Sequence, residues 1–368
     1  DVIYKAASKI ASADPNVTAP LLLINWSVNN TTASGDKSLG QISTSHYASD
    51  TKELFILGKA DVDTDEYDDH VIAHEFGHYF EDRFSRTDNI GGSHSGSDKQ
   101  DPRIAFGEGF GNAFSGMVTD DQHYIDTGGA SQSTTMLHDD IEGNNPAPGS
   151  IGWFSEASIQ SALYDIYDSA DDGADTLSLG FAPIYSVFVN GQKNAESFTS
   201  IYSFASFLKA ANPLSAAKIN SILQRENISS SAVDEWDSTG TETNDGGYAK
   251  TLPVYTRLTS GAPAANLCSS GQFGSINKLR NRSFFYIEVA AARDYTITVV
   301  PDIDGDAVVS LYSKGQLLIG AKDDFANGGT ETLTLSLTPG KYAGEVYEYQ
   351  HINGTTYIAE ECFDITFN

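Results

Sequence analysis

The chain has 368 residues, of which 40% are hydrophobic and 11% aromatic, so it can bury a large core and global disorder is excluded. Its 22 Lys and Arg stand against 50 Asp and Glu, which gives a formal net charge of -28. This charge excludes nucleic acids and anionic membrane surfaces as partners, because phosphate groups require clustered basic residues and the sequence has no basic run. No apolar stretch is long enough to span a membrane, and the length predicts two domains.

The first two thirds of the chain predict an alternation of helices and short strands. Apolar residues that recur on one helix face identify the helices, and compact apolar runs identify the strands. We expect helices at residues 1–14, 70–84, 104–118, 155–167, 197–211 and 216–225. We expect strands at 19–28 and 53–58, with the apolar run at 19–24 buried. The segment 91–102 is rich in Gly, Ser and Asp and is expected to be a loop.

After about residue 250 the sequence changes to short alternating apolar runs, separated by turns that contain Gly and Pro. Strands are expected at 284–290, 295–300, 307–312, 332–337, 342–347 and 356–358. Short strands at this spacing are typical of an all-β sandwich. The predicted fold class is therefore α+β, with a mixed domain over 1–250, a linker over 251–265 and a small all-β sandwich domain over 266–368.

The segment His74-Glu75-Phe76-Gly77-His78 carries the clearest chemical signal. Two histidines four residues apart lie on one face of a helix, where both can bind a single zinc ion. Glu75 can take a proton from a water that the zinc activates, so it is the candidate general base for attack on a carbonyl group. Gly77 costs about 1 kcal/mol in a helix relative to Ala, which predicts that another backbone approaches closely at this position.

Residues 106–117 resemble the second active-site helix of the gluzincin metallopeptidases, the thermolysin-like and related families, in which Glu-Gly or Glu-Ala is followed by small residues. The resemblance implies a zincin-like catalytic domain with Glu108 as the third zinc ligand. It also implies that Asn112 accepts a hydrogen bond from a zinc-bound histidine. The connection over 79–107 is longer than gluzincins commonly have, so other third ligands remain open: His94, Asp98 and Asp101.

Gluzincins usually stabilise the oxyanion with a tyrosine or histidine from later in the domain. Tyr164 lies broadly where that tyrosine occurs, so the resemblance makes it a candidate catalytic residue. A tyrosine that only packs in the core is the competing interpretation. Three histidines are alternative donors: His94, His123 and His138.

The C-terminal part resembles the bacterial pre-peptidase C-terminal domain, a β-sandwich that follows secreted proteases. The similar segments are 284–286, 295–299, 305–307, 311–312 and 339–342. Three aspartates in this part admit a calcium site, although their spacing does not fit an EF-hand and a solvated acidic turn is the alternative: Asp302, Asp304 and Asp306.

Cys268 and Cys362 bracket the predicted sandwich. One cysteine pair in a chain rich in Ser, Thr, Asn and Gly is typical of an exported protein with a single disulfide, and two unrelated buried thiols are the alternative. We expect an extracellular bacterial protein in its mature form, after removal of a signal peptide and any propeptide.

These observations predict a secreted zinc-dependent peptidase, acting as a monomer on protein or peptide substrates, of the endopeptidase type. One alternative is a non-catalytic, zinc-stabilised surface protein whose sandwich docks to carbohydrate or to another protein. A metallohydrolase for non-peptide amides or esters is a further alternative. Glu75 favours an enzyme, because a structural zinc needs no general base and requires a fourth ligand. Every catalytic candidate precedes residue 170, so the sandwich is expected to be dispensable for hydrolysis.

Overall fold

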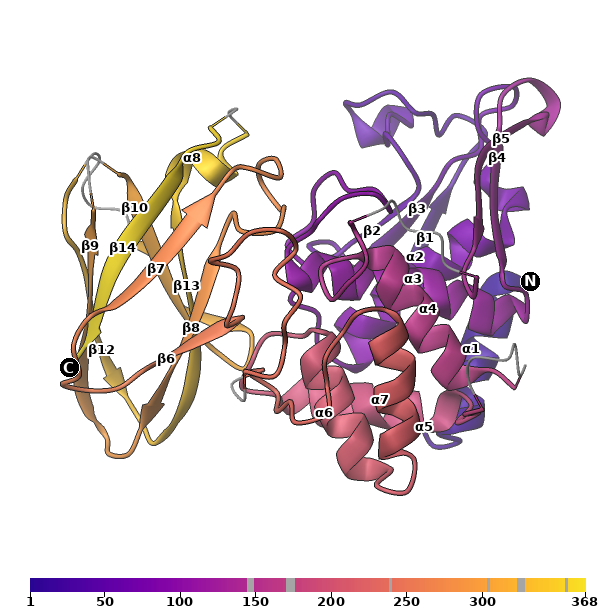
Figure 1. The fold of residues 1–368 in the computed structure, drawn as a ribbon. Helices are drawn as coiled ribbons and strands as arrows, with labels where there is room; N and C mark the ends of the chain where they lie inside the picture. Colours follow the sequence, from indigo (N-terminus) through magenta and orange to yellow (C-terminus); the bar gives the residue numbers. More distant parts are fainter. Residues whose placement is uncertain (144–148, 170–175, 238–239, 303–304, 323–327, 355–356) are drawn as a thin grey trace.

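The computed structural model describes residues 1–143, 149–169, 176–237, 240–302, 305–322, 328–354 and 357–368. Helices and two small sheets form one part of the molecule, and a β-sandwich forms the other (Figure 1). This arrangement agrees with the expected order of a mixed part followed by an all-β part. Within the described residues, no helix is both long and apolar enough to cross a membrane.

The helical part is built around three helices that pack together. Their bounds and those of the remaining helices are α1 (Val2–Ala13), α2 (Asp69–Phe84), α3 (Pro102–Thr119), α4 (Glu156–Tyr167), α5 (Phe181–Ser186), α6 (Ile201–Ala211), α7 (Ala216–Arg225) and the short α8 (Tyr349–Ile352). α3 lies between α2 and α4, and nearly all its side chains are buried. The expected helices are confirmed within a few residues, and α5 was not expected.

Small residues allow α2 and α3 to approach closely. A Cβ atom added to Gly77 of α2 would lie 3.3 Å from the Cα of Gly111 on α3. The close backbone approach expected at Gly77 is therefore confirmed. Its consequence is that the helix with the two histidines lies directly against the helix with Glu108.

The two small sheets flank α2. The first has the order β1-β3-β2, with β1 (Leu23–Trp26) parallel to β3 (Glu53–Ile56) and β2 (His46–Ala48) antiparallel to it. The second is a hairpin of β4 (His123–Gly128) and β5 (Thr134–Asp140), which the sequence analysis did not predict. The burial expected for residues 19–24 is wrong. β1 is an edge strand whose four side chains are exposed, and Leu21 before it is 77% exposed.

The sandwich consists of a five-stranded and a four-stranded sheet, of order β11-β10-β13-β8-β6 and β12-β9-β14-β7. The strands are β6 (Tyr255–Leu258), β7 (Ala265–Ser270), β8 (Ser283–Val289), β9 (Arg293–Pro301), β10 (Ala307–Ser313), β11 (Gln316–Lys322), β12 (Glu331–Leu337), β13 (Gly340–Glu348) and β14 (Glu360–Phe367). Side chains from both sheets form one core between them, which includes Phe285, Val309, Ile297 and Phe363.

Three expectations for the sandwich differ from the structure. The segment 251–265 is not only a linker, because β6 lies in it and pairs with β8. The last strand begins at Glu360 rather than in 356–358, where residue 356 lies outside the described residues and 357–358 are not in a strand. β7 and β11 were missed; the small and polar residues of β7 give no apolar alternation.

The expected disulfide is confirmed. Cys268 on β7 and Cys362 on β14 face each other in the antiparallel register and are bonded. The bond therefore joins the beginning of the four-stranded sheet to its last strand.

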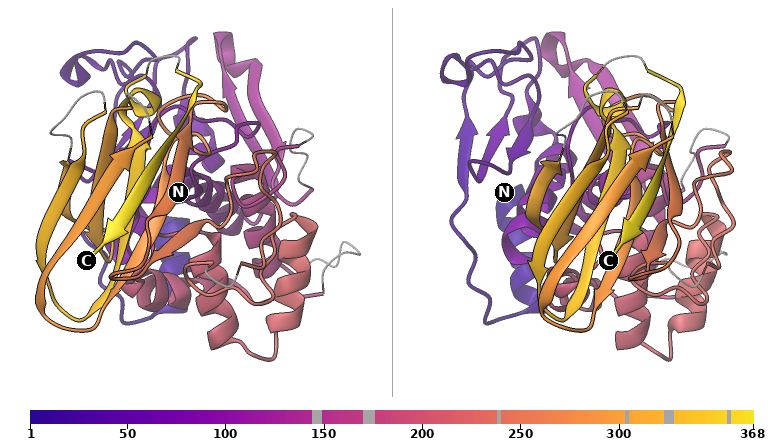
Figure 2. Two further views of the ribbon diagram at one scale, coloured as in Figure 1. Left: turned by 60° about the vertical axis from the view of Figure 1, so that its left-hand side comes forward. Right: turned by 90° about the vertical axis from the view of Figure 1, so that its left-hand side faces the viewer.

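The sandwich also shares a core with the helical part. Phe284 and Tyr286 of β8 point away from the sandwich interior and pack with Phe198 and Trp236. When viewed from its own side, the sandwich lies over the helices (Figure 2). Because one face of the five-stranded sheet is covered by the helical part, these contacts argue against a dispensable sandwich.

Candidate metal centre

Helix geometry brings the three expected zinc ligands together. His74 and His78 lie one turn apart on α2, and Glu108 faces them from α3. Their ligand atoms all lie within 4.8 Å of one another. Glu108 Oε2 is 3.3 Å from His74 Nε2 and 3.2 Å from His78 Nε2, and the two Nε2 atoms are 3.0 Å apart. Two imidazole nitrogens and one carboxylate oxygen are a donor set that suits zinc.

Gly111 makes room for the first histidine. A Cβ atom at this position would lie 2.8 Å from His74 Cε1, so any larger residue would displace the imidazole ring. The glycines of α3 that weaken it as an isolated helix thus have a packing reason at the centre.

Each histidine has its second ring nitrogen beside an acceptor. Asn112 Nδ2 donates to Gln160 Oε1 at 2.8 Å, so Asn112 Oδ1 is the atom that faces His74 Nδ1, also at 2.8 Å. His74 must then carry its proton on Nδ1, which leaves the Nε2 lone pair free for a metal. Glu81, buried one turn beyond His78, lies 3.6 Å from His78 Nδ1.

A hydrogen bond from a neighbouring side chain also fixes the orientation of Glu108. Asn89 Nδ2 donates to Glu108 Oε1 at 2.9 Å, so Oε2 is the oxygen that faces the histidines. Burial opposes the charge of Glu108, but His78 and His74 hold its pKa well below the usual range. The charged form of Glu108, which this environment favours, is the form that can bind zinc.

Glu75 lies beside the ligands, and its carboxylate is held at one end. The backbone N–H of Tyr47 on β2 donates to Glu75 Oε2 at 2.8 Å. Within the part of the chain that the structure describes, nothing donates to Glu75 Oε1. One oxygen is thus positioned by an edge strand, and the other is available for proton transfer.

These residues line a cleft of about 790 Å³. Its walls come from β2, from the loop after α2 and from the β4–β5 hairpin, and they include Tyr47, Ile90, His94, Tyr124 and Leu137. The cleft combines apolar and polar side chains around Glu75 and the ligand group, as a substrate site requires.

A known protein family matches the part of the chain that contains the candidate zinc ligands. The family described as mycolysin C-terminal domain matches residues 12–222, more than half of the chain, and this range contains α2 and α3 with all three candidate ligands. The chain belongs to the mycolysin C-terminal domain family. This family is associated with secreted peptidases. None of the curated proteins matches the chain.

Solved structures similar to this member of the mycolysin C-terminal domain family have low identity. The pre-peptidase C-terminal domain of collagenase from Bacillus anthracis is 18% identical, with 31% of this chain and 94% of that chain covered and a TM-score of 0.23. PliG from Aeromonas hydrophila, a periplasmic lysozyme inhibitor of g-type lysozyme, is 15% identical, with 31% and 96% covered and a TM-score of 0.21.

In this family member Tyr164 does not occupy a catalytic position. It is buried on α4 against Gly116, one turn beyond Asn112 on α3, and it is not among the described residues that line the cleft. Eight residues along a helix separate Gly116 from Glu108, a rise of about 12 Å. The proposed oxyanion role of Tyr164 is therefore wrong, and the packed-core interpretation holds.

Most alternative residues are engaged elsewhere. Asp101 caps α3 and pairs with Arg103 at 2.9 Å, and Asp98 pairs with Lys278 at 3.1 Å. His123 and His138 are exposed on the hairpin, where their rings contact each other. Neither aspartate is placed as a third ligand, and neither histidine lines the cleft.

His94 is the alternative that the structure brings into the site. Its Nε2 lies 3.4 Å from Glu108 Oε2, and its Nδ1 lies 2.8 Å from Glu156 Oε2. Burial lowers the pKa of His94, but Glu156 and Glu108 raise it to about 9 overall. Tyr124, which the sequence analysis missed, places its ring 6.3 Å from that of His74 and also lines the cleft.

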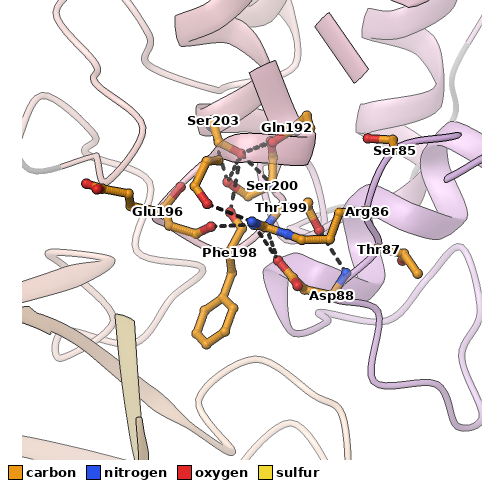
Figure 3. A network of polar contacts seen from close by, with 12 residues as sticks. Ser85, Arg86, Thr87, Asp88, Gln192, Glu196, Phe198, Thr199, Ser200 and Ser203 are labelled. Atoms are coloured by element: carbon orange, nitrogen blue, oxygen red, sulfur yellow. Dashed lines mark hydrogen bonds and ion pairs between the residues drawn. The ribbon is translucent and has the colours of Figure 1, made fainter. Parts of the chain in front are cut away.

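The loop that carries Asn89 and His94 is held at both ends. Figure 3 shows its start, where Arg86 lies beside Asp88 and donates to it. Arg86 also donates to the carbonyls of Ala195 and Ser197. Asp88 in turn accepts from the backbone of Thr199 at 2.8 Å (Figure 3).

Farther along, the sandwich holds the same loop. Asn277 Nδ2 donates to the carbonyl of Gly91 at 2.9 Å, and Lys278 Nζ donates to that of Ser93 at 2.7 Å. The loop that supplies Asn89 and His94 is thus positioned by both parts of the molecule. No local sequence pattern encodes this arrangement.

The aspartates considered for calcium in the sandwich remain a prediction. Asp304 lies outside the described residues, and Asp302 is exposed. The backbone N–H of Asp306 donates to Glu348 Oε2 at 2.6 Å.

Proposed function

We propose that this chain is a secreted zinc peptidase that hydrolyses protein or peptide substrates as a monomer, with Glu75 as its general base. The observation that carries the proposal is the convergence of His74, His78 and Glu108, with Glu75 beside them in one cleft. Membership of a family associated with secreted peptidases supports it.

Each side chain has a defined task in this proposal. His74, His78 and Glu108 would hold the ion, and bound zinc would lower the pKa of a water and polarise a carbonyl group. Glu75 would accept the proton of the attacking water and then donate it to the leaving amine nitrogen. The N–H of Tyr47 would keep Glu75 aimed at the water throughout. His94 and Tyr124 replace Tyr164 as candidate donors to the developing oxyanion, because both line the cleft.

A non-catalytic zinc-stabilised protein fits the site less well. A structural zinc site closes with four protein ligands, whereas the group found among the described residues near His74 has three members. Such a protein would also have no use for Glu75, whose carboxylate is held in the open cleft. Hydrolysis of non-peptide amides or esters would use the same residues. Assays that compare peptide with non-peptide substrates distinguish the two activities.

The test is the Glu75→Gln variant. Glutamine has nearly the same shape as glutamate but cannot accept the proton, so turnover should fall by about 10²–10⁴-fold or more while zinc is retained. The measurement is zinc content by elemental analysis together with cleavage of casein and of a peptide library, read by mass spectrometry. Glu288→Gln is the control, because Glu288 is exposed on the sandwich and pairs with the exposed Arg257. If Glu75→Gln keeps its zinc and cleaves within about tenfold of the wild type, the assigned mechanism is wrong.

A further inference from the structure

A second group of acidic side chains lies in the wall of the same cleft. Asp63 and Asp65 precede α2, and Asp126 is on β4. One carboxylate oxygen from each of the three lies within 4.8 Å of the other two. Asp63 is 6% exposed and Asp65 is 3% exposed, so these two carboxylates are largely removed from water, and Asp126 is partly buried.

No basic side chain among the described residues balances the charge of this group. Among the described residues, no Lys, Arg or His nitrogen forms an ion pair with Asp63, Asp65 or Asp126. Asp65 accepts a hydrogen bond from Ser45. Asp63 Oδ1 and Asp126 Oδ1 are buried and have no hydrogen-bond partner. A buried group of carboxylates is strongly unfavourable when all of them are charged. Burial, followed by a hydrogen bond with Asp63, raises the pKa of Asp65 to about 8, so the group takes up a proton unless a cation replaces it.

We propose that Asp63, Asp65 and Asp126 bind a calcium ion. Calcium is coordinated by carboxylate oxygens at about 2.3–2.6 Å, so oxygens on opposite sides of the ion lie up to about 5 Å apart. The spacing of the three oxygens fits that limit. A lysine or arginine side chain of a substrate is the other cation that could enter from the cleft. The burial of Asp63 and Asp65 favours the small ion, because a whole side chain would need more open access.

The proposed ion would connect three segments around the zinc ligands. Asp65 begins the turn that leads into α2, and Asp126 belongs to the hairpin that also supplies Tyr124. Through Ser45, Asp65 is joined to the chain just before β2, the strand whose Tyr47 holds Glu75. Calcium would thus fix the cleft wall without touching the zinc ligands.

The experiment follows the thermal unfolding of the full chain while CaCl2 is added, in the Glu75→Gln background, which prevents self-digestion. We expect one calcium per chain by isothermal titration. We also expect a rise in Tm of about 3–4 °C at one hundred times Kd, for a chain of this length. Asp63→Asn should abolish both effects, whereas Asp50→Asn, which removes an exposed charge outside the group, should leave both intact.

The behaviour without calcium is a second readout that does not depend on activity. Because Asp63→Asn removes a carboxylate charge from the buried group, the calcium-free variant should have a Tm equal to or higher than that of the calcium-free parent. When calcium is present, the parent should have a higher Tm than the Asp63→Asn variant. His74→Ala removes a proposed zinc ligand and should keep the calcium response. The calcium proposal can therefore be tested independently of the zinc proposal.

Two results would overturn the proposal. The first is an unchanged Tm and no calcium heat in the parent protein. The second is an equal calcium response in the parent and in Asp63→Asn, checked with Asp126→Asn. A loss of preference for Lys or Arg substrates in active Asp63→Asn, without any calcium response in the parent, would assign the group to substrate binding instead.

Discussion

Asn112 controls which nitrogen of His74 is free to bind a metal. Its Oδ1 faces His74 Nδ1 because its Nδ2 is occupied by Gln160. Asn112→Leu should therefore weaken zinc affinity by about 10–100-fold, the usual loss for such outer partners. Asn112→Asp keeps an acceptor at the same place and should retain affinity. Zinc competition titration measures both, and equal affinity in the wild type and the leucine variant would contradict the assigned role.

Asp237 makes the stability of the fold depend on pH. It is 1% exposed, and burial, followed by Glu242 and Asp234, raises its pKa to about 8. An unfolded aspartate has a pKa of about 3.9, so the folded chain holds a proton that the unfolded chain has released. This contribution to stability is complete below about pH 4 and is lost as the pH rises through about 8.

Asp237→Asn should remove this dependence. Asparagine stays neutral, so the variant should gain Tm relative to the wild type at pH 9 but not at pH 5. Thermal unfolding at the two pH values checks this, with Asp50→Asn as an exposed control. An equal difference between variant and wild type at both pH values would show that Asp237 is not the titrating group.

At the scale of elements, the loop after α2 depends on the sandwich. Lys278 donates to Ser93 and pairs with Asp98, and the same loop presents His94 to the site. Lys278→Met should lower kcat/KM by about 10–100-fold, because small displacements at a catalytic site have effects of this size. Zinc content and Tm should change little. Lys314→Met, on an exposed turn of the sandwich, is the control. Unchanged kcat/KM in Lys278→Met would mean that the loop is positioned without the sandwich.

An element can be predicted from the sequence when the pattern that identifies it lies within a single segment of the chain. α2 and α3 could be predicted, because apolar spacing and the His74–His78 repeat lie within single helices. β5 could not, because it is exposed along most of its length and forms only by pairing with β4. Tyr164 was misassigned since its chain position matches a catalytic tyrosine, whereas its actual environment is set by packing against Gly116.

At the scale of the whole molecule, one ion pair buries charge between the two parts. Arg103 on α3 is 2% exposed and lies 2.9 Å from both Asp101 and Glu345 of β13. Its guanidinium also covers the ring of Phe198. A long-range pair of this kind could not be predicted from sequence, because neither residue belongs to a local pattern and they are brought together only by the packing of the sheet on the helices.

Removal of the sandwich should therefore unfold the helical part. A chain of residues 1–250 would expose Phe198 and Trp236, and it would leave Arg103 without Glu345. Loss of one partner of a buried ion pair by itself lowers the free energy of unfolding by about 3–5 kcal/mol. We expect this fragment to aggregate or to lose cooperative unfolding, measured by circular dichroism and size-exclusion chromatography. A soluble fragment with full zinc content and normal turnover would restore the view that the sandwich is dispensable.

The most direct test of the proposed metal centre is anomalous diffraction from crystals of the full chain on the two sides of the zinc absorption edge. We predict one strong peak present only above the edge, about 2.0–2.2 Å from His74 Nε2, His78 Nε2 and Glu108 Oε2. Glu75 should lie beside the peak without binding it. The absence of zinc, or a zinc peak held by other residues while Glu108 points away, would contradict the metal centre on which the proposed function depends.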